Sequence, residues 1–493
     1  MRILVVTQHF WPENFRINDI VEGFVQDGLS VDVLCGLPNY PKGEWFDGYS
    51  ADGPFEEVYK GARVFRAREI PRKGNTGKTI FLNYVSWPPY AAGALKRLPG
   101  GYDAVFCFNT SPVLMCWPAI RYAKKHHIPF TNYVLDLWPE NLYSVLPVKN
   151  RFMRWVAQSV SDSLYRRCDR LIAMSGPLQE RLCARTGLDQ VFFGNSGAEA
   201  NEGAIKCARK YSVTTYGPDR NKVLTLVNSF HGRTLATLTA TGQDVFHKDF
   251  GPFPANFGYI PANDFDTFKA AVDDSVCAVM MEMVQGEGGV VALDADYVQS
   301  VADYCHAHDI LIIVDEVQTG VGRTGTFLAC EQFGLKPDLV TLAKGLGGGL
   351  PIGAVLMNEK VAAGMGAGTH GSTFGGNPVV CAGANVVVDR MDNGFLANVN
   401  ERAVQLRTGL AKLPMVKSLS GIGLMVGIEF FGDVRAADVL AACREKGLLV
   451  LTAKTRLRLL PPLTLTAHDV EKALAILNEV LSEMAQKSPE EQA

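Results

Sequence analysis

The sequence predicts an α/β protein of several domains, built on parallel sheets covered by helices. The chain has 493 residues, which is more than one ordinary domain contains. Short apolar runs bounded by turn residues alternate with segments of helical periodicity in both halves, and this alternation is typical of parallel strands joined by crossover helices. The character of the sequence changes around residues 178–186 without a linker rich in Pro, Gly or Ser.

The first part opens on a buried strand, Arg2–Val6, whose apolar run is too short for a signal peptide. A helix follows at Ile17–Gln26 and ends at Gly28, and Val31–Cys35 forms the next strand. Two more apolar runs and one helical segment complete this part. They are the strands Ala104–Phe108 and Phe130–Val134 and the helix Arg151–Arg167.

The helix expected at Arg151–Arg167 has basic ends. Its arginines are Arg151, Arg154, Arg166 and Arg167. Such a helix either touches a membrane surface or presents a solvated face. The pattern by itself favours the solvated face.

Several motifs of the first part occur in a known family. They are the turn Thr7–Glu13, the pattern Gly28-Leu-Ser-Val-Asp-Val, Pro38-Asn-Tyr-Pro41 and Asp136-Leu-Trp-Pro-Glu140. On these residues, the segment 1–180 resembles the N-terminal half of a family 4 glycosyltransferase of the two-Rossmann-domain (GT-B) type. The resemblance implies a Rossmann-like domain. In that family the second half holds the nucleotide-sugar site, and we find neither that half nor its Glu-x7-Glu signature here, so sugar transfer is not expected.

Composition restricts the partners. A net charge of −3 gives no electrostatic reason to expect nucleic acid. The eleven cysteines are scattered without zinc-ligand spacing, so we expect reduced thiols and no metal. We find no uninterrupted apolar stretch of about 18 residues, which predicts no membrane span and a cytoplasmic protein.

A candidate phosphate-binding turn lies at Phe192-Phe-Gly-Asn-Ser-Gly-Ala-Glu-Ala-Asn-Glu202. A short strand there leads through small residues into a helix start, where free backbone N–H groups hold anions. Ser196-x-x-Glu199 is also a capping box, which needs no ligand. The turn alone therefore leaves both interpretations open.

A second candidate follows the strand Val223–Val227, in Asn228-Ser-Phe-His-Gly-Arg-Thr234. Ligands of open α/β sheets bind at the carboxyl ends of strands. Phe230 is suited to stack on a planar ring and Arg233 to bind a carboxylate. A core phenylalanine and a surface arginine explain the same residues equally well.

The most informative pair is Asp315 and Lys344. The buried strand Ile310–Val314 leads into Asp315, a helical stretch lies near Phe327–Phe333, and the strand Asp338–Ala343 delivers Lys344 into a glycine run. The interval suits one strand–helix–strand crossover, which brings both side chains to one sheet edge. A lysine can form an imine with an aldehyde, and a carboxylate can keep a pyridine nitrogen protonated. Pyridoxal phosphate (PLP) enzymes need both groups.

With these motifs in place, residues from about Cys183 to Met484 resemble the class III (ω-amino acid) aminotransferases, and within them the enzymes that act on N-acetylornithine. The segment Arg185–Glu202 and the region Asp315–Gly349 carry the resemblance. It implies a fold-type I PLP-transferase large domain at 183–388 and a small α/β domain at 389–486. In the latter, Gly421–Phe430 and Leu448–Leu451 read as strands, and Thr466-x-x-Asp469 caps a helix to about Met484. The tail 487–493 is expected to be disordered.

The resemblance also assigns roles residue by residue. It places Gly197 and Ala198 at the phosphate, Phe230 on the ring, Asp315 at the ring nitrogen, Gln318 near the phenolic oxygen and Lys344 at the aldehyde, with Glu316 and Val317 counted among the cofactor-binding residues. Ser372 corresponds to a substrate contact. Thr373 corresponds to a residue that reaches the phosphate of the neighbouring subunit, so the resemblance implies a homodimer.

Two arginines and a glutamate would handle the substrates. The resemblance implies that Arg233 binds the carboxylate far from the reacting amine, and that Arg458 binds the α-carboxylate of glutamate or 2-oxoglutarate. Glu287 would occupy Arg458 when the other substrate is bound, which avoids an unpaired buried guanidinium. The implied reaction transfers the terminal amine of N-acetylornithine to 2-oxoglutarate and gives N-acetylglutamate semialdehyde and glutamate. Succinylornithine, ornithine and 4-aminobutyrate remain alternative donors.

The family's opening segment is not recognisable before residue 183. The chain therefore reads as two incomplete proteins joined near residue 180, by natural fusion or by an error of assembly or gene calling. Two other functions stay open on the sequence: a truncated glycosyltransferase-like protein, and a fusion that binds PLP without turning over.

Overall fold

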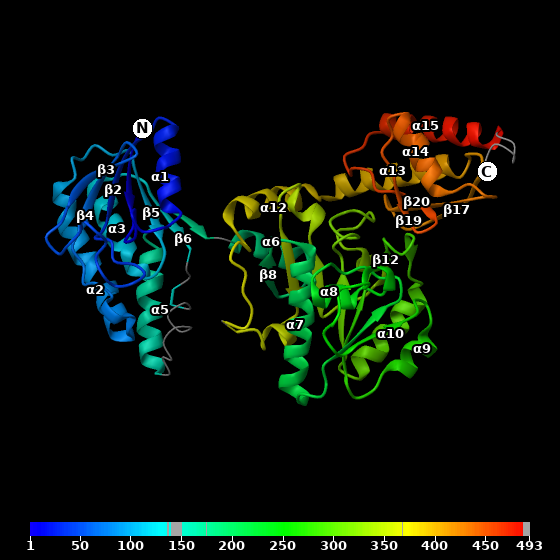
Figure 1. Ribbon diagram of the computed structural model, residues 1–493, viewed down its shortest axis with the longest axis horizontal. Coiled ribbons are helices and arrows are strands. Elements are labelled where there is room, and N and C mark those ends of the chain that lie inside the picture. Colours follow the sequence, from blue (N-terminus) through cyan, green and yellow to red (C-terminus); the bar gives the residue numbers. More distant parts are fainter. Residues whose placement is uncertain (136–137, 140–149, 174, 367, 487–493) are drawn as a thin grey trace. The chain divides into compact units, whose positions relative to one another are not determined.

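The computed structural model describes residues 1–135, 138–139, 150–173, 175–366 and 368–486 (Figure 1). The chain divides into two compact units, Met1–Met174 and Ser175–Ala493. Part of the motif Asp136–Glu140 and the tail 487–493 lie outside the described residues. The expected domain boundaries near residues 180 and 388 stay predictions. Among the described helices, none is long and apolar enough to cross a bilayer.

The first unit is a seven-stranded sheet in the order β3-β4-β2-β1-β5-β6-β7, in which only β3 runs antiparallel to its neighbour. Alternation along β1 sends Ile3 and Val5 to one face and Leu4 and Val6 to the other, and each set joins a separate core cluster. The strands are β1 (Arg2–Val6), β2 (Ser30–Gly36), β3 (Glu56–Tyr59), β4 (Ala62–Ala67), β5 (Ala104–Asn109), β6 (Phe130–Val134) and β7 (Arg170–Ala173).

Helices cover both faces of this sheet (Figure 1). The helix α1 (Ile17–Gln26) packs on one face, and α2 (Gly77–Ala94), α3 (Trp117–His126) and α5 (Arg151–Tyr165) contribute to the core of the other. Gly28 has φ of 79° just after α1, a conformation that glycine adopts without strain. The strand and helix expectations for this unit are confirmed within a few residues.

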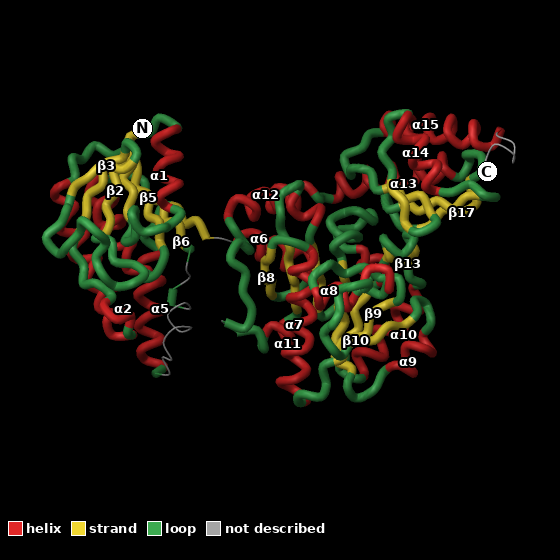
Figure 2. Tube along the Cα trace, viewed as in Figure 1, coloured by secondary structure: helices red, strands yellow, loops and turns green. Residues whose placement is uncertain are grey.

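The second unit is built on another seven-stranded sheet, in the order β10-β9-β11-β14-β15-β16-β8 (Figure 2). Strands β10, β9, β11, β14 and β15 are parallel, whereas β16 runs antiparallel to both of its neighbours, β15 and β8. The strands are β8 (Gln190–Gly194), β9 (Lys222–Leu226), β10 (Phe257–Ile260), β11 (Val276–Met281), β14 (Leu311–Asp315), β15 (Leu339–Leu342) and β16 (Gly353–Met357), with a small hairpin of β12 (Val284–Gln285) and β13 (Val291–Ala292) beside them.

Here too, alternate residues of the central strands face opposite cores. Leu311 and Ile313 pack with α7, and Ile312 and Val314 pack with α6, α10 and α12. The α-helices of this sheet are α6 (Gly176–Thr186), α7 (Gly197–Tyr216), α8 (Leu235–Ala240), α9 (Phe265–Ala271), α10 (Ala295–Ala307), α11 (Glu359–Ala362) and α12 (Pro378–Arg390).

The connection between β14 and β15 differs from the expected strand–helix–strand crossover. Its helical segment is the 3-10 helix η5 (Ala329–Phe333), a short piece with i→i+3 bonds. Gly334, with φ of 63°, closes this helix. The two strands are nevertheless parallel neighbours, as the crossover required.

The C-terminal part carries its own antiparallel sheet, β17-β18-β20-β19, with a separate core shared with α13, α14 and α15. Thr466 and Asp469 exchange backbone-to-side-chain hydrogen bonds, which confirms the predicted cap before α15. The elements are β17 (Val416–Ser420), β18 (Val426–Phe430), β19 (Leu451–Ala453), β20 (Arg456–Leu459), α13 (Asn393–Leu410), α14 (Ala436–Glu445) and α15 (Ala467–Gln486).

Two strand predictions in this part were wrong. The segment expected as one strand at Gly421–Phe430 begins with a turn, because Gly421 and Gly423 have φ of 83° and 59° and only Val426–Phe430 is extended. The strand expected at Leu448–Leu451 instead begins at Leu451 and runs to Ala453.

Candidate active site

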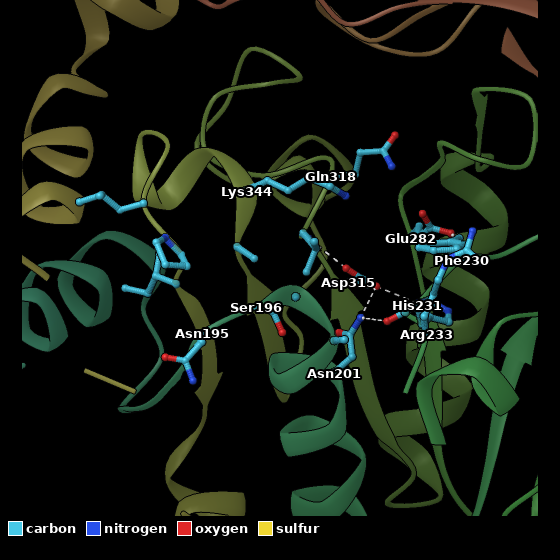
Figure 3. A pocket seen from close by; sticks show the side chains of 18 of the residues that line it. Asn195, Ser196, Asn201, Phe230, His231, Arg233, Glu282, Asp315, Gln318 and Lys344 are labelled. Carbon is cyan, nitrogen blue, oxygen red and sulfur yellow. Dashed lines mark hydrogen bonds and ion pairs between the residues drawn. The ribbon is translucent and has the colours of Figure 1, made fainter. Parts of the chain in front are cut away.

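The candidate site lies at the carboxyl edge of the parallel sheet in the second unit. The ends of β9, β11, β14 and β15 and the start of α7 meet there around a cavity of about 650 Å³ (Figure 3). Eight of the residues predicted from the sequence line this cavity: Gly197, Ala198, Phe230, Arg233, Asp315, Val317, Gln318 and Lys344. They come from four separate stretches of the chain.

Lys344 and Asp315 enter the cavity from neighbouring strands (Figure 3). Asp315 is the last residue of β14 and pairs with Thr341 of β15. Lys344 follows β15 at the first turn of the short helix η6 (Lys344–Gly347), with φ of 42°. Left-handed backbone is uncommon for a residue other than glycine and often marks functional positions. The Lys344 side chain is exposed, whereas Asp315 is 3% exposed.

The Asp315 carboxylate is held by donors from three directions. Its Oδ2 accepts hydrogen bonds from Asn201 Nδ2 at 2.7 Å and from His231 Nδ1 at 2.8 Å. Its Oδ1 accepts one from the backbone N–H of Val317 at 3.0 Å, and the Thr341 hydroxyl lies at 3.5 Å. The Thr341 contact is the longest of the four, so it is the one that a further donor from the cavity would replace at Oδ1.

His231 and Glu282 extend this network into the protein interior. Burial lowers the pKa of His231, but the hydrogen bond and the negative charge of Asp315 outweigh it, so that the pKa is raised. Burial raises the pKa of Glu282 to about 7, while the charge of His231 opposes and that of Asp315 adds to the shift. Glu282 also accepts a hydrogen bond from the backbone N–H of Phe230 at 3.0 Å. The three titratable groups thus share one buried electrostatic environment.

The start of α7 also lines the cavity. Ser196 caps this helix by accepting a hydrogen bond from the backbone N–H of Glu199 at 3.1 Å. Glu199 does not return a bond to Ser196 but accepts one from the backbone N–H of Asn195 at 2.7 Å, so only half of the predicted capping box forms. A Cβ at Gly197 would lie 2.6 Å from Val317 Cγ1, which explains the glycine.

Phe230 and Arg233 stand on the loop after β9. The Arg233 guanidinium lies 5.7 Å from the Phe230 ring centroid and 4.9 Å from that of Phe246. Arg233 is exposed at the cavity wall, where an incoming carboxylate can reach it.

Arg458 and Glu287, both predicted for substrate handling, form an ion pair outside the cavity lining. Arg458 Nη1 lies 2.7 Å from Glu287 Oε1 and 3.5 Å from Gln318 Oε1. The Arg458 side chain is 7% exposed and that of Glu287 32%. Gln318 therefore connects this pair with the cavity. A Cβ at Gly286 would overlap Gln318 Oε1, so the glycine allows this approach.

Three other predicted residues do not line the cavity. Glu316 is buried and accepts hydrogen bonds from the Thr319 hydroxyl and the Cys330 backbone N–H. Ser372 accepts a hydrogen bond at 3.1 Å from the side-chain Nδ2 of Asn195, which lines the cavity, so Ser372 lies beside the cavity. Thr373 is exposed.

Sequence reasoning assigned no role to Asn201, His231 or Glu282, which surround Asp315. Signals were nevertheless present for two of the three. Asn201 lies one helical turn after Gly197 and so shares its face. Glu282 directly follows β11, at the same sheet edge as Asp315.

Taken together, the cavity is lined by an amine, a buried carboxylate, the start of a helix and one arginine, and a second arginine lies beside it. In agreement, residues 158–481 match the family described as Aminotransferase class-III, and the chain belongs to this family. Residues 15–191 match Glycosyltransferase Family 4. These matches confirm both predicted resemblances and the predicted enzyme class, a transaminase.

Three similar proteins illustrate how far the likeness extends. The acetylornithine aminotransferase of Haemophilus ducreyi is 54% identical over 63% of this chain and 79% of its own length. Among solved structures, N-acetylornithine aminotransferase from Stenotrophomonas maltophilia K279a is 35% identical, with a TM-score of 0.55 over 64% of this chain and 80% of its own. Ornithine aminotransferase from Toxoplasma gondii ME49 is 33% identical, with a TM-score of 0.61 over 64% of this chain and 77% of its own.

Proposed function

We propose that the second unit is a PLP-dependent transaminase that moves the terminal amine of N-acetylornithine to 2-oxoglutarate. One observation carries this proposal: Lys344 and Asp315 enter one cavity from the carboxyl ends of neighbouring parallel strands. The similarity to acetylornithine aminotransferases supports the choice of donor.

The residues of the cavity fit PLP. At Asp315 Oδ1 the Thr341 hydroxyl is a long and weak donor at 3.5 Å, which a protonated ring nitrogen would replace. The start of α7, where Gly197 leaves no Cβ in the way, would hold the phosphate, and Phe230 would lie against the ring. When bound, PLP supplies an aldehyde that condenses with amines and a ring that accepts electrons.

The protein's own groups would supply the proton transfers. Lys344 Nζ would take a proton from the substrate carbon that carries the amine and later return it, as base and then acid. The Asp315 carboxylate, held in place by Asn201 and His231, would face the ring nitrogen and favour its protonated form. The exposed position of Lys344 leaves its amine accessible to the substrate.

Arg233 and Arg458 would bind the substrate carboxylates. Arg233 takes the one remote from the reacting amine. Arg458 is paired with Glu287 in this structure, which suits a substrate without a carboxylate beside its amine. Glutamate or 2-oxoglutarate would replace Glu287 on Arg458. Thr373, exposed and outside the cavity of its own chain, is available to a neighbouring subunit, so we also propose a homodimer.

The experiment uses the purified chain reconstituted with PLP. We expect visible cofactor absorbance that changes when N-acetylornithine is added, and loss of both the lysine-bound absorbance and turnover in Lys344→Ala. The assignment fails when the wild type takes up no cofactor, or when the absorbance of Lys344→Ala is the same as that of the wild type. Cofactor uptake without product at saturating substrates would mean a protein that binds PLP without catalysis.

The donor is decided by a second measurement. Steady-state kcat/KM is compared for N-acetylornithine, succinylornithine, ornithine and 4-aminobutyrate with 2-oxoglutarate as acceptor. We expect N-acetylornithine to be preferred, and a higher value for another amine would replace it as the substrate.

A further inference from the structure

The guanidinium of Arg233 is held at the cavity wall by aromatic rings and not by an opposite charge. Its Cζ lies 4.9 Å from the ring centroid of Phe246 and 5.7 Å from that of Phe230. Across the residues that the structure describes, Arg233 has no carboxylate partner and donates no hydrogen bond. Its N–H donors are therefore available to a ligand, while the attraction of a cation to ring faces sets where the guanidinium lies.

The two rings have different places in the site. They pack edge to face, with centroids 5.5 Å apart and an interplanar angle of 78°. Phe230 lines the cavity beside Arg233 (Figure 3), where it is assigned to the cofactor ring. Phe246 is half-buried and does not line the cavity. The contact of Phe246 with Arg233 therefore has no part in the function described so far.

Phe246 is tied to the loop that carries Arg233. It ends the short 3-10 helix η4 (Asp244–Phe246). Just before this helix, Gly242 accepts a hydrogen bond from the backbone N–H of Asn228 at 2.7 Å and donates one to Ser229 Oγ at 3.0 Å. Gln243 Nε2 donates to the Ser229 carbonyl at 3.0 Å. These bonds fix η4 against the start of the loop after β9.

We propose that Phe246 is a positioning residue, which holds the Arg233 guanidinium where the substrate carboxylate remote from the reacting amine meets it. This inference rests on the proposed function, in which Arg233 binds that carboxylate. An arginine side chain loses much rotamer freedom when a ligand orders it. A ring that orders Arg233 beforehand removes part of that cost, and it does so without occupying the N–H donors.

The two substrate arginines are thus prepared in opposite ways. Arg458 is paired with Glu287, a partner that a substrate carboxylate can replace. Arg233 needs no replaceable partner, because N-acetylornithine and glutamate both carry a carboxylate remote from the reacting amine. A carboxylate in the place of Phe246 would compete with both substrates, whereas a ring face does not.

The test compares two amine donors on the full chain reconstituted with PLP. N-acetylputrescine has the chain and the terminal amine of N-acetylornithine but lacks the carboxylate. In Phe246→Leu, the half-reaction with N-acetylornithine should need about fivefold more donor for half-saturation, with a smaller change in maximal rate. The half-reaction with N-acetylputrescine should keep its rate constant. Phe246→Tyr retains a ring and should restore the preference for N-acetylornithine.

Two further variants show whether Phe246 acts through Arg233. Arg233→Gln should lower the preference for N-acetylornithine more than Phe246→Leu does, and adding Phe246→Leu to it should change the preference no further. The matched control is Phe257→Leu. Phe257 is also half-buried, the Arg209 Cζ lies 4.8 Å from its ring centroid, and neither residue lines the cavity, so the preference should stay that of the wild type.

Equal loss with both donors in Phe246→Leu would overturn the inference, because a damaged fold affects both alike. A preference unchanged in Phe246→Leu would also overturn it, as would a further loss when this change is added to Arg233→Gln.

A second measurement does not depend on turnover. Phenylglyoxal modifies accessible arginines, and peptide masses report the extent at Arg233. Glutarate, a dicarboxylate that cannot react, should protect Arg233 in the wild type and should require about fivefold higher concentration in Phe246→Leu. Equal protection in both proteins, or none in the wild type, would overturn the inference. A chain that takes up no PLP would refute the proposed function instead, so the two failures are distinguishable.

Discussion

The ion pair between Arg458 and Glu287 gives the sharpest test of how one site accepts two substrates. We consider Glu287→Ala. Breaking a fully buried ion pair costs about 3–5 kcal/mol, because an uncompensated charge remains. The Glu287 side chain is 32% exposed, so solvent screens part of its attraction to Arg458. We therefore expect the loss of the pair to cost about 2 kcal/mol.

In the variant, the α-carboxylate of glutamate no longer has to displace Glu287 from Arg458. About 2 kcal/mol corresponds to roughly thirtyfold in affinity. We therefore expect kcat/KM for glutamate, relative to N-acetylornithine, to rise by about this factor. N-acetylornithine should react more slowly, since its complex leaves the Arg458 guanidinium, 7% exposed, without a partner.

The assay follows the two half-reactions separately in single turnover, through the cofactor absorbance. Glu479→Ala is the control, because it removes one exposed partner of Lys446 far along the sequence on α15 and should leave the ratio unchanged. The reasoning is refuted when Glu287→Ala changes both half-reactions by the same factor, since Glu287 would then have only a structural role.

Three further predictions concern the groups around the cavity. His231→Phe removes a charge-assisted hydrogen bond to Asp315 and should destabilise the protein by about 2 kcal/mol. Because the folded pKa of His231 is raised above 6.5, this loss should be complete below pH 6.5 and shrink as pH rises through the folded value, measured as the unfolding midpoint against pH. In the wild type, the pKa of Glu282 is about 7 in the folded protein and about 4.5 in the unfolded chain, so its ionisation destabilises the fold as the pH rises. Glu282→Gln removes this effect. The free energy of unfolding of the variant, relative to that of the wild type, should therefore be about 3 kcal/mol higher above pH 7 than at acid pH. Gly197→Ala would place a Cβ 2.6 Å from Val317 Cγ1, cost about 1–3 kcal/mol and weaken PLP binding in equilibrium dialysis.

Controls exist within the same unit. Gly176→Ala should be neutral, since a Cβ at Gly176, the first residue of α6, meets nothing within 4 Å. If the free energies of unfolding of Glu282→Gln and of the wild type change in parallel with pH, the proposed ionisation of Glu282 is contradicted. PLP affinity in Gly197→Ala equal to that of Gly176→Ala would remove the argument about the helix start.

Most of the secondary structure was predictable because it depends on local patterns. The apolar run before Asp315, the glycine after α1 and the cap at Thr466 each act within a few residues, and all three occur in the structure. The errors arose where backbone conformation overrides composition. Gly421 and Gly423 turn a segment that reads as a strand. The helical stretch expected near Phe327–Phe333 does form, as the 3-10 helix Ala329–Phe333.

The sequence alone determined the class of chemistry. Asp315 and Lys344 each follow an apolar strand, and the interval between them along the chain suits a single crossover between neighbouring strands. Only the tertiary structure decided what holds Asp315, since Asn201 and His231 lie 114 and 84 positions away in the chain. It also decided which face of α5 meets solvent, because burial depends on what packs against a helix and not on its own periodicity. Local spacing fixes where an element ends, whereas long-range packing fixes which side chains meet and which remain exposed.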